Sequence, residues 1–431
     1  MRLIDEASLE ALGGSRPADT LTVWAWRDGS LVIPEPLQVL GGSFQDDAGD
    51  SVKIGQKISL TVADPDGVLG AWRHDDPLGV GGTRLQIIYR VGGAGAMNYG
   101  WFRIVDNEPE EMVEWRKIAE YGYDEPDSTL PQHERMVPIV TAVVKLEAVD
   151  LTYGPDINRF EAPESPGGGA TAISEFTRLM AAHFPVVVDP GVTDVAVSRL
   201  LIFDRERLEA GQDLLSRVSA RYRMGGDGEC RVYPRDTAPV WRTEPGNCLV
   251  SVGRKQSVDG LYNRWVVEGK DANTGAPIRA TASITEGPLK YGGDHGMNPH
   301  FYTSEMIATY DQAVAYAQEL RAQFLDSIAI ELTVETTPRP ELQAGDRIDV
   351  GYPVNGHVAY LTGRITAIRR AFTPTPTTTA LKVTCSYADV IRALSAPTWG
   401  QYLTAGLPEL TWDRMPGSWG TAPSITWDDL P

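Results

Sequence analysis

The amino-acid sequence predicts a mainly β protein in which an α+β module is inserted between two small β-barrel-like domains. Gly and Pro contribute 43 and 30 of the 431 residues, and this excess over average composition favours many turns between short strands. The segments between these turns are rich in β-branched and aromatic residues that alternate with polar ones. A chain of this length is too long for one ordinary core, so we expect two to four domains.

Residues 1–152 are expected to form the first barrel-like domain. Residues 21–33 predict a hairpin, because alternating segments flank Asp28 and Gly29. Other strands are predicted at 57–63, 84–89, 101–105 and 141–148. Between the last two strands, the Glu- and Pro-rich stretch of about 106–137 predicts a polar excursion from the sheet.

Residues 153–240 are expected to form a helix-hairpin module, entered through a Gly- and Pro-rich linker at 160–170. Two groups of apolar residues have helical spacing: Ile173, Phe176, Leu179 and Met180, and then Leu214, Leu215, Val218 and Tyr222. A hairpin of residues 221–224 and 230–233 follows, joined by a Gly-rich turn.

Residues 241–395 are expected to form the second barrel-like domain. Strands are predicted at 265–268, 278–284, 327–334, 347–350, 359–367 and 379–385. A helix is predicted over about 309–325, because Thr309 and Gln312 fit a capping box and apolar residues then recur on one face.

The last segment, 396–431, predicts an extended tail. Residues 410–416 recur in similar form at 425–431, with a Trp-Asp pair in each copy. One such unit buries too little surface to offset its ordering entropy. Tryptophan is favoured at interfaces, so we expect the four tryptophans of the tail to be partner-binding anchors: Trp399, Trp412, Trp419 and Trp427. The alternative is a tail that folds back onto its own domains.

Charge and cysteine content limit the classes of partner. Lys and Arg number 39 against 58 Asp and Glu, for a net charge of −19, which disfavours binding to nucleic acid or to anionic membranes. The acidity either serves solubility or lines a channel through which DNA passes without binding. Three cysteines without a C-x-x-C pair indicate neither disulfides nor zinc. No signal peptide and no membrane-spanning segment is expected.

The sequence offers no constellation that calls for an enzyme. Its six histidines form no metal-ligating pair, and it has neither a nucleophile elbow nor a phosphate-binding loop. His74, Asp75 and Asp76 are interpreted as solvated turn residues. We therefore predict no catalytic, cofactor-binding or metal-binding residues and no cofactor.

Several segments together resemble one family of viral structural proteins. These are residues 60–67, 144–150, 257–269, which contain a D-G-x-Y-N stretch, and 340–350, followed by the Trp-Asp repeat. In their order and spacing they are similar to baseplate hub or tail-tip hub proteins, also called minor tail proteins, of long-tailed bacteriophages, particularly the actinobacteriophage type. The resemblance spans about 60–395, and the excursion at 106–137 departs from it.

The resemblance implies a virion structural protein of the tail tip, assembled in the bacterial host cytoplasm. The resemblance implies two related barrels in each chain, as in hub proteins. A homotrimeric ring would then contain six similar barrels and present pseudo-six-fold symmetry, so that it could join a tail tube to a central spike or fibre. Implied partners are the distal tail or tube ring, the spike or fibre, and the tape measure, with DNA only in transit. The alternative is a tail-associated cell-wall hydrolase or a carbohydrate- or receptor-binding protein.

Overall fold

Strands dominate the protein. They make up 47% and helices 15% of the computed structural model, which confirms the predicted mainly β class. Residues 394–431 lie outside the described residues. Within 1–393 the described residues exclude 3, 13–18, 50–51, 93, 121–132, 200, 236, 247, 256–259, 271–275, 288, 304–308, 328, 355–356, 373–377, 387–388 and 391–392.

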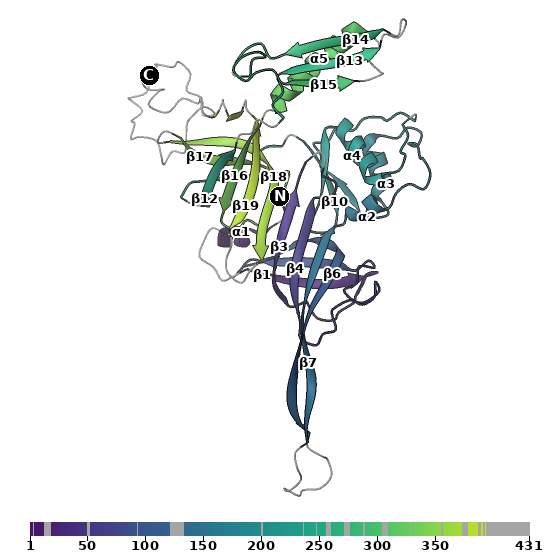
Figure 1. The fold of residues 1–431 in the computed structure, drawn as a ribbon, viewed down its shortest axis with the longest axis vertical. Coiled ribbons are helices and arrows are strands. Elements are labelled where there is room, and N and C mark those ends of the chain that lie inside the picture. The colour runs from purple at the N-terminus through teal and green to yellow at the C-terminus, as the bar shows by residue number, and fades with distance from the viewer. Residues whose placement is uncertain are drawn as a thin grey trace. The chain divides into compact units, whose positions relative to one another are not determined.

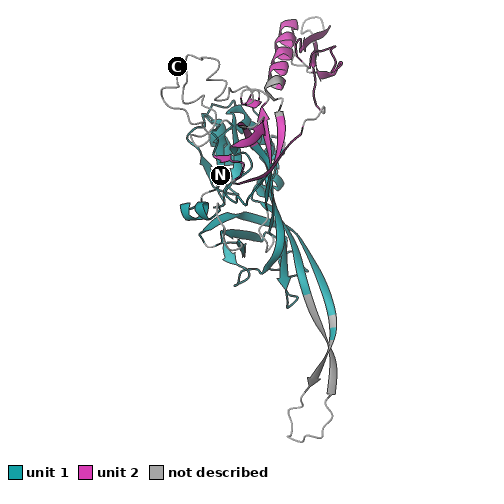
Figure 2. Cartoon of the chain, turned by 90° about the vertical axis from the view of Figure 1, so that its left-hand side faces the viewer, with its two compact units in different colours: residues 1–240, 335–347, 365–381 teal, residues 241–334, 348–364, 382–431 magenta. Residues whose placement is uncertain are grey.

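The chain divides into two compact units, coloured separately in Figure 2. Unit 1 comprises residues 1–240, 335–347 and 365–381, and unit 2 comprises the rest. The chain passes between the units within four strands, β16 (Ala329–Thr336), β17 (Arg347–Val354), β18 (His357–Phe372) and β19 (Thr379–Ser386). The predicted domain boundaries and the barrel-like character of the domains remain predictions.

Unit 1 is built on an antiparallel sheet with strand order β18-β3-β4-β7-β6-β5-β1-β2 (Figure 1). Helix α1 (Glu6–Leu12) precedes strands β1 (Thr20–Arg27), β2 (Ser30–Leu31), β3 (Val39–Asp47), β4 (Gln56–Asp64), β5 (Arg84–Arg90), β6 (Ala96–Glu120) and β7 (His133–Asp150). The predicted hairpin turn is confirmed: Asp28 and Gly29 have φ values of 49° and 77° between the paired strands β1 and β2, as a type I′ turn requires.

The core of unit 1 lies on one face of this sheet. Strand β4 alternates between buried and more exposed residues, as its sequence predicts. Phe44, Tyr99 and Phe102 are fully buried there, with ring centroids 4.7 and 6.2 Å from Phe44 to the other two. A core of this kind explains why the strand alternation is so regular.

Two arginines are buried beside this aromatic group. Arg2 donates from Nε to the Tyr99 carbonyl at 3.0 Å and from Nη1 to the Leu342 carbonyl at 3.2 Å. Arg370 donates to the Tyr99 hydroxyl and to the Arg339 and Leu342 carbonyls, the last at 3.2 Å. The two guanidiniums therefore fasten residues 339–342, which are distant in sequence, to the N-terminal sheet.

Within the predicted polar excursion at 106–137, residues 106–120 and 133–137 belong to strands β6 and β7. Strands β6 and β7 remain paired from Phe102 opposite Asp150 as far as Glu120 opposite His133. In Figure 1 the two strands continue beyond the neighbouring strands as a long hairpin. Residues 121–132 lie outside the described residues. Few side chains of residues 106–113 are buried, so the hydrophobic alternation that marks a half-buried strand is absent there.

The helix-hairpin module follows β7. It contains α2 (Tyr153–Ile157), α3 (Ala172–Met180), α4 (Arg207–Arg217) and a sheet of order β8-β10-β9, with β8 (Val186–Val188), β9 (Ala220–Met224) and β10 (Cys230–Pro234). The predicted face of α3 is buried, which confirms that helix. The second predicted helix extended too far along the chain. Helix α4 ends at Arg217, Ser219 has a φ of 49°, and Tyr222 belongs to strand β9.

Unit 2 contains two groups of strands. One group includes β11 (Trp241–Thr243) and β12 (Leu249–Lys255) and has the strand order β12-β16-β19-β18. In the same group, β17 pairs with both β18 and β11. The other has the order β14-β13-β15, from β13 (Arg264–Lys270), β14 (Pro277–Ser283) and β15 (Pro299–Thr303). Helix α5 (Tyr310–Ser327) buries Ala313 and Ala317 against this sheet.

The start of α5 confirms part of the predicted cap, since the Gln312 N–H donates to Thr309 Oγ1 at 3.3 Å. Across the described residues, no helix is both long enough and apolar enough to cross a membrane.

Candidate functional site

The four tryptophans predicted as partner anchors, Trp399, Trp412, Trp419 and Trp427, lie outside the described residues. Their role therefore stays a prediction. Within the described part of the chain, two other features of unit 1 have the character of binding sites: a cavity beside the helix-hairpin module, and a surface of exposed aromatic residues at the base of the long hairpin. Neither group of residues was singled out as a site from the sequence.

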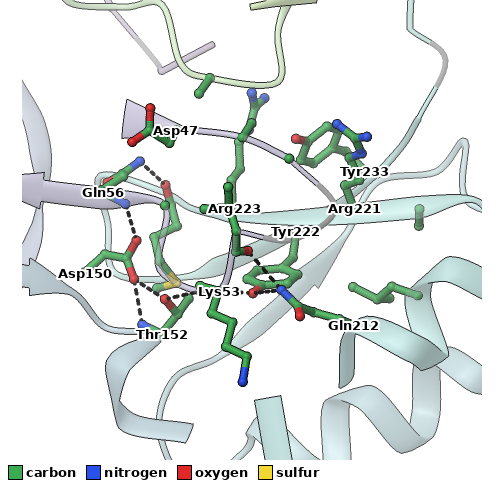
Figure 3. A pocket seen from close by; sticks show the side chains of 18 of the residues that line it. Asp47, Lys53, Gln56, Asp150, Thr152, Gln212, Arg221, Tyr222, Arg223 and Tyr233 are labelled. Atoms are coloured by element: carbon green, nitrogen blue, oxygen red, sulfur yellow. Dashed lines mark hydrogen bonds between the residues drawn. The ribbon is translucent and has the colours of Figure 1, made fainter. Parts of the chain in front are cut away.

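The cavity has a volume of about 390 Å³. Figure 3 shows that its wall combines the loop before β4, the end of β7, helix α4 and strand β9. Hydrogen bonds connect these elements across the wall. Gln212 donates to the Val52 carbonyl at 3.0 Å, and the Tyr222 hydroxyl donates to the Lys53 carbonyl at 3.1 Å. The helix-hairpin module is thus joined to the first sheet around this cavity.

Asp150 is a buried carboxylate in the cavity wall. It accepts hydrogen bonds from the Gln56 N–H at 2.7 Å, from the Thr152 N–H at 2.9 Å and from the Thr152 hydroxyl. Burial raises the pKa of Asp150 to about 6, although these three hydrogen bonds favour the charged form. The desolvation of the carboxylate therefore outweighs its hydrogen bonding.

This shift predicts a specific pH dependence of stability. The folded protein holds a proton on Asp150 up to about pH 6, whereas an unfolded Asp loses it near pH 4, so this contribution is largest below pH 4 and is lost as the pH rises towards 6. Asp150→Asn should remove it. The difference between wild type and variant in the free energy of unfolding should change by about 2–3 kcal/mol between pH 4 and pH 7, measured by urea denaturation. A constant difference over that range would contradict the shift.

Arginines form another side of the cavity. Arg221 and Arg223 are two residues apart in β9 and so point to the same face, and Tyr233 lies opposite Arg221 in the neighbouring strand. Arg223 packs over the Tyr233 ring at 4.6 Å and pairs with Asp346 at 2.6 Å. Arg235 also lines the cavity. This wall thus offers guanidinium groups beside tyrosine rings.

Three carboxylates that line the cavity have partners of their own. Asp47 pairs with Arg369 at 2.7 Å, and Asp46 accepts the Ala344 N–H at 3.1 Å. Glu209 lies 3.6 Å from Lys53. These three acidic residues of the cavity are therefore engaged by other groups of unit 1.

The second feature is the loop between β4 and β5, which presents Trp72 with 88% of its surface exposed. The loop is ordered by its own carboxylates. Asp64 accepts the N–H groups of Val68 and Leu69 at 2.9 and 2.8 Å, and Asp76 accepts that of Trp72 at 2.8 Å. Because these hydrogen bonds fix the loop backbone, little backbone entropy is lost when Trp72 binds a partner, which is favourable for an interface anchor.

The loop packs against the base of the long hairpin. A Cβ placed on Gly70 would come within 2.9 Å of Pro109, and Asn107 donates to the Leu78 carbonyl at 3.0 Å. Just beyond this contact, Met112, Val113 and Trp115 are 64%, 52% and 63% exposed. Exposed aromatic and apolar residues therefore occur both on the loop and on the adjoining part of the hairpin.

Sequence patterns gave little warning of this surface. Trp72 is a single tryptophan in a polar loop, and Trp115 follows a run of glutamates, so neither repeats as the tail tryptophans do. Among the described residues, no group of three or more His, Cys, Asp or Glu side chains is arranged to hold a metal ion.

No protein-family model matches the sequence, and the search of curated proteins gives no match. Solved structures do match. The chain is similar to the tail protein from Neisseria meningitidis MC58, with 12% identity over 84% of this chain and 96% of that one, and a TM-score of 0.50. It is also similar to the 43 kDa tail protein of prophage MuSo2 from Shewanella oneidensis, with 10% identity, 84% and 98% coverage, and a TM-score of 0.51.

A third structure, the prophage tail protein gp18 from Listeria monocytogenes EGD-e, matches with 12% identity, 86% and 99% coverage and a TM-score of 0.46. The two more similar structures are matched over almost their whole lengths. The chain therefore has the fold of phage tail proteins.

Proposed function

We propose that this protein is a structural subunit of a phage tail tip, acting as a baseplate hub and not as an enzyme. The observation that carries the proposal is the fold, which is shared with two phage tail proteins over 84% of this chain. The exposed Trp72 and Trp115 support it, because a subunit that assembles with others needs such anchors.

The hub would be a homotrimeric ring. A cyclic interface closes on itself and so limits assembly to one ring. If each chain contributes two related β domains, the ring presents pseudo-six-fold symmetry to a tail tube and three-fold symmetry to a spike or fibre. A net charge of −19 supports a lumen through which DNA moves without binding. The sequence resemblance adds the actinobacteriophage type and the tape measure as a further neighbour.

Cryo-electron microscopy of the parent virion tests this function directly. Three copies of the chain are expected at the end of the tail, closing a ring around the axis. Light scattering of the purified full-length chain at micromolar concentration should give the trimer mass. A chain that is absent from the tail tip, or purified protein that cleaves host cell wall in a zymogram, would favour the hydrolase alternative.

A further inference from the structure

The loop between β4 and β5 covers one face of the long hairpin at its base. The Ala71 N–H donates to Asn107 Oδ1 at 3.3 Å, and Asn107 Nδ2 donates to the Leu78 carbonyl at 3.0 Å. A Cβ placed on Gly70 would come within 2.9 Å of Pro109. Asn107 and Pro109 are two residues apart in β6, and side chains at this spacing point to the same face of a strand. The loop therefore lies over the face that carries these two residues.

The same face carries exposed apolar side chains further along β6. Val113 and Trp115 keep the alternation of Pro109, because the register of β6 with β7 is unbroken along this stretch. Both side chains are more than half exposed, and the loop adds Val68 and Trp72, which are more exposed still. Isolated apolar side chains are ordinary on a protein surface, whereas several on adjoining segments indicate an interaction site. We refer to these four side chains as the apolar surface.

Carboxylates outnumber cations around the apolar surface. Residues 64–76 contain four Asp, one Arg and one His, and residues 106–113 contain four acidic residues and no basic one. Residues 140–147 of the paired strand β7 add one Lys and one Glu. Arg27 of β1 also reaches the loop, where it donates to two backbone carbonyls. The surroundings of the apolar surface therefore carry an excess of negative charge.

The cations of these segments are already paired within the chain, whereas an exposed carboxylate remains. Lys145 pairs with Glu110 across the two strands, and Arg73 pairs with Asp75 at 2.6 Å. Glu111 is exposed on the same face as Val113, and it takes part in none of the salt bridges among the described residues. This carboxylate is therefore available to a cationic group of a partner.

The charge of these surroundings selects the class of partner. A second copy of the chain is disfavoured, because its own net charge of −19 would repel the acidic segments. Nucleic acid and anionic membranes are disfavoured for the same reason. A basic polypeptide is attracted, and the aliphatic stems of its Lys and Arg side chains can pack on the two indoles while their charged ends reach the carboxylates.

We propose that the apolar surface and the carboxylates around it bind a basic segment of a different tail protein. Apolar and arginine side chains of that segment would pack on Trp72 and Trp115, and a Lys or Arg would pair with Glu111. The hydrogen bonds that fix the loop backbone reduce the entropy that is lost on binding. This inference rests on the proposed tail function and assigns one of its contacts to a partner of opposite charge.

Site-specific photocross-linking in the assembled virion tests the identity of the partner. With the photoreactive amino acid p-benzoylphenylalanine in place of Val68, ultraviolet light should join the chain to a different polypeptide, and the joined peptide should contain more Lys and Arg than Asp and Glu. The same amino acid in place of Ile202 is the matched control, because Ile202 is 64% exposed against 68% for Val68 but belongs to the helix-hairpin module. The control should not give that product.

Calorimetric titration of the purified full-length chain with a synthetic peptide of the joined sequence tests the contacts. Trp72→Ala and Trp115→Ala should each weaken binding by about 30-fold, as expected for the loss of a hot-spot tryptophan. Met112→Ala should leave the affinity unchanged, because Met112 is about as exposed as Trp115 but lies on the opposite face. Glu111→Gln should weaken binding less, and it should reduce the loss of affinity that follows when the salt concentration is raised.

All four substituted side chains are exposed, so far-UV circular dichroism should show an unchanged fold. A cross-link from position 68 to a second copy or to an acidic segment overturns the inference, and so does the absence of any cross-link in virions that contain the chain. Equal affinities for wild type and Trp72→Ala also overturn it. Each of these results leaves the proposed tail function standing, whereas a chain that is missing from the virion overturns both.

Discussion

Replacing Arg370 with methionine is expected to lower the free energy of unfolding by about 3 kcal/mol or more. Arg370 is 7% exposed and donates to the Tyr99 hydroxyl and to the carbonyls of Arg339 and Leu342. Methionine has a similar shape but donates nothing. The Tyr99 hydroxyl and the Arg339 carbonyl would lose this donor, at about 1–3 kcal/mol for each group left unsatisfied, whereas the Leu342 carbonyl would keep its hydrogen bond from Arg2.

The neighbouring residue provides the control. Arg369 pairs with Asp47 at 2.7 Å, but its side chain is 44% exposed. An exposed ion pair contributes about 1 kcal/mol or less, so Arg369→Met should change stability little. Urea denaturation at pH 7, followed by tryptophan fluorescence, measures both variants. Similar losses for the two would mean that Arg370 acts as a general charge and not as a donor to residues 339–342.

This role of Arg370 marks the limit of what local patterns predict. The strand alternation of β4, the turn at Asp28 and Gly29 and the buried face of α3 follow from residues close together in sequence, and the structure confirms them. Unit 1 also takes in residues 335–347 and 365–381. Their return to the N-terminal sheet depends on long-range contacts such as those of Arg2 and Arg370, which no local period encodes.

The hairpin shows a second limit. Polarity usually separates strand from loop because a strand buries one face. In residues 106–113 few side chains are buried, so the sequence has the composition of a loop although the backbone pairs as a strand. The end of α4 shows the same competition between signals: Tyr222 has helical spacing from Leu215, but the left-handed conformation of Ser219 stops the helix first.

Neither strand and helix periodicity nor residue polarity predicts the candidate site. The cavity draws its wall from residues near 50, 150, 212 and 222, which only the folded chain brings together. The exposure of Trp72 and Trp115 is likewise a property of the fold, since a tryptophan of the same sequence context could equally be buried. The repeat that does stand out in the sequence, around Trp412 and Trp427, lies outside the described residues.

Substitution of Asp346 should also lower the free energy of unfolding strongly, because its carboxylate pairs with two positively charged groups beside the cavity. Its carboxylate accepts the Met1 amino group at 2.7 Å, Arg223 at 2.6 Å and the Gln343 N–H at 2.9 Å, and its side chain is 3% exposed. Asp346→Asn would leave the Arg223 guanidinium, itself largely buried, without its anion. A loss of about 3 kcal/mol or more in the free energy of unfolding at pH 7 is expected.

The pH dependence of this loss distinguishes the ion pair from a simple packing defect. Burial raises the pKa of Asp346, but Arg223 and the Met1 ammonium outweigh burial and hold the pKa below its usual value. The contribution is therefore present above about pH 4 and is lost as the pH falls through the lowered pKa. Urea denaturation should show that the free energies of unfolding of wild type and Asp346→Asn converge below pH 4. This pH dependence is opposite to that of Asp150, whose raised pKa makes its contribution to stability largest at acid pH. A deficit that stays the same from pH 7 to pH 3 would mean that Asp346 acts through shape, and that the arginine wall is held by other residues.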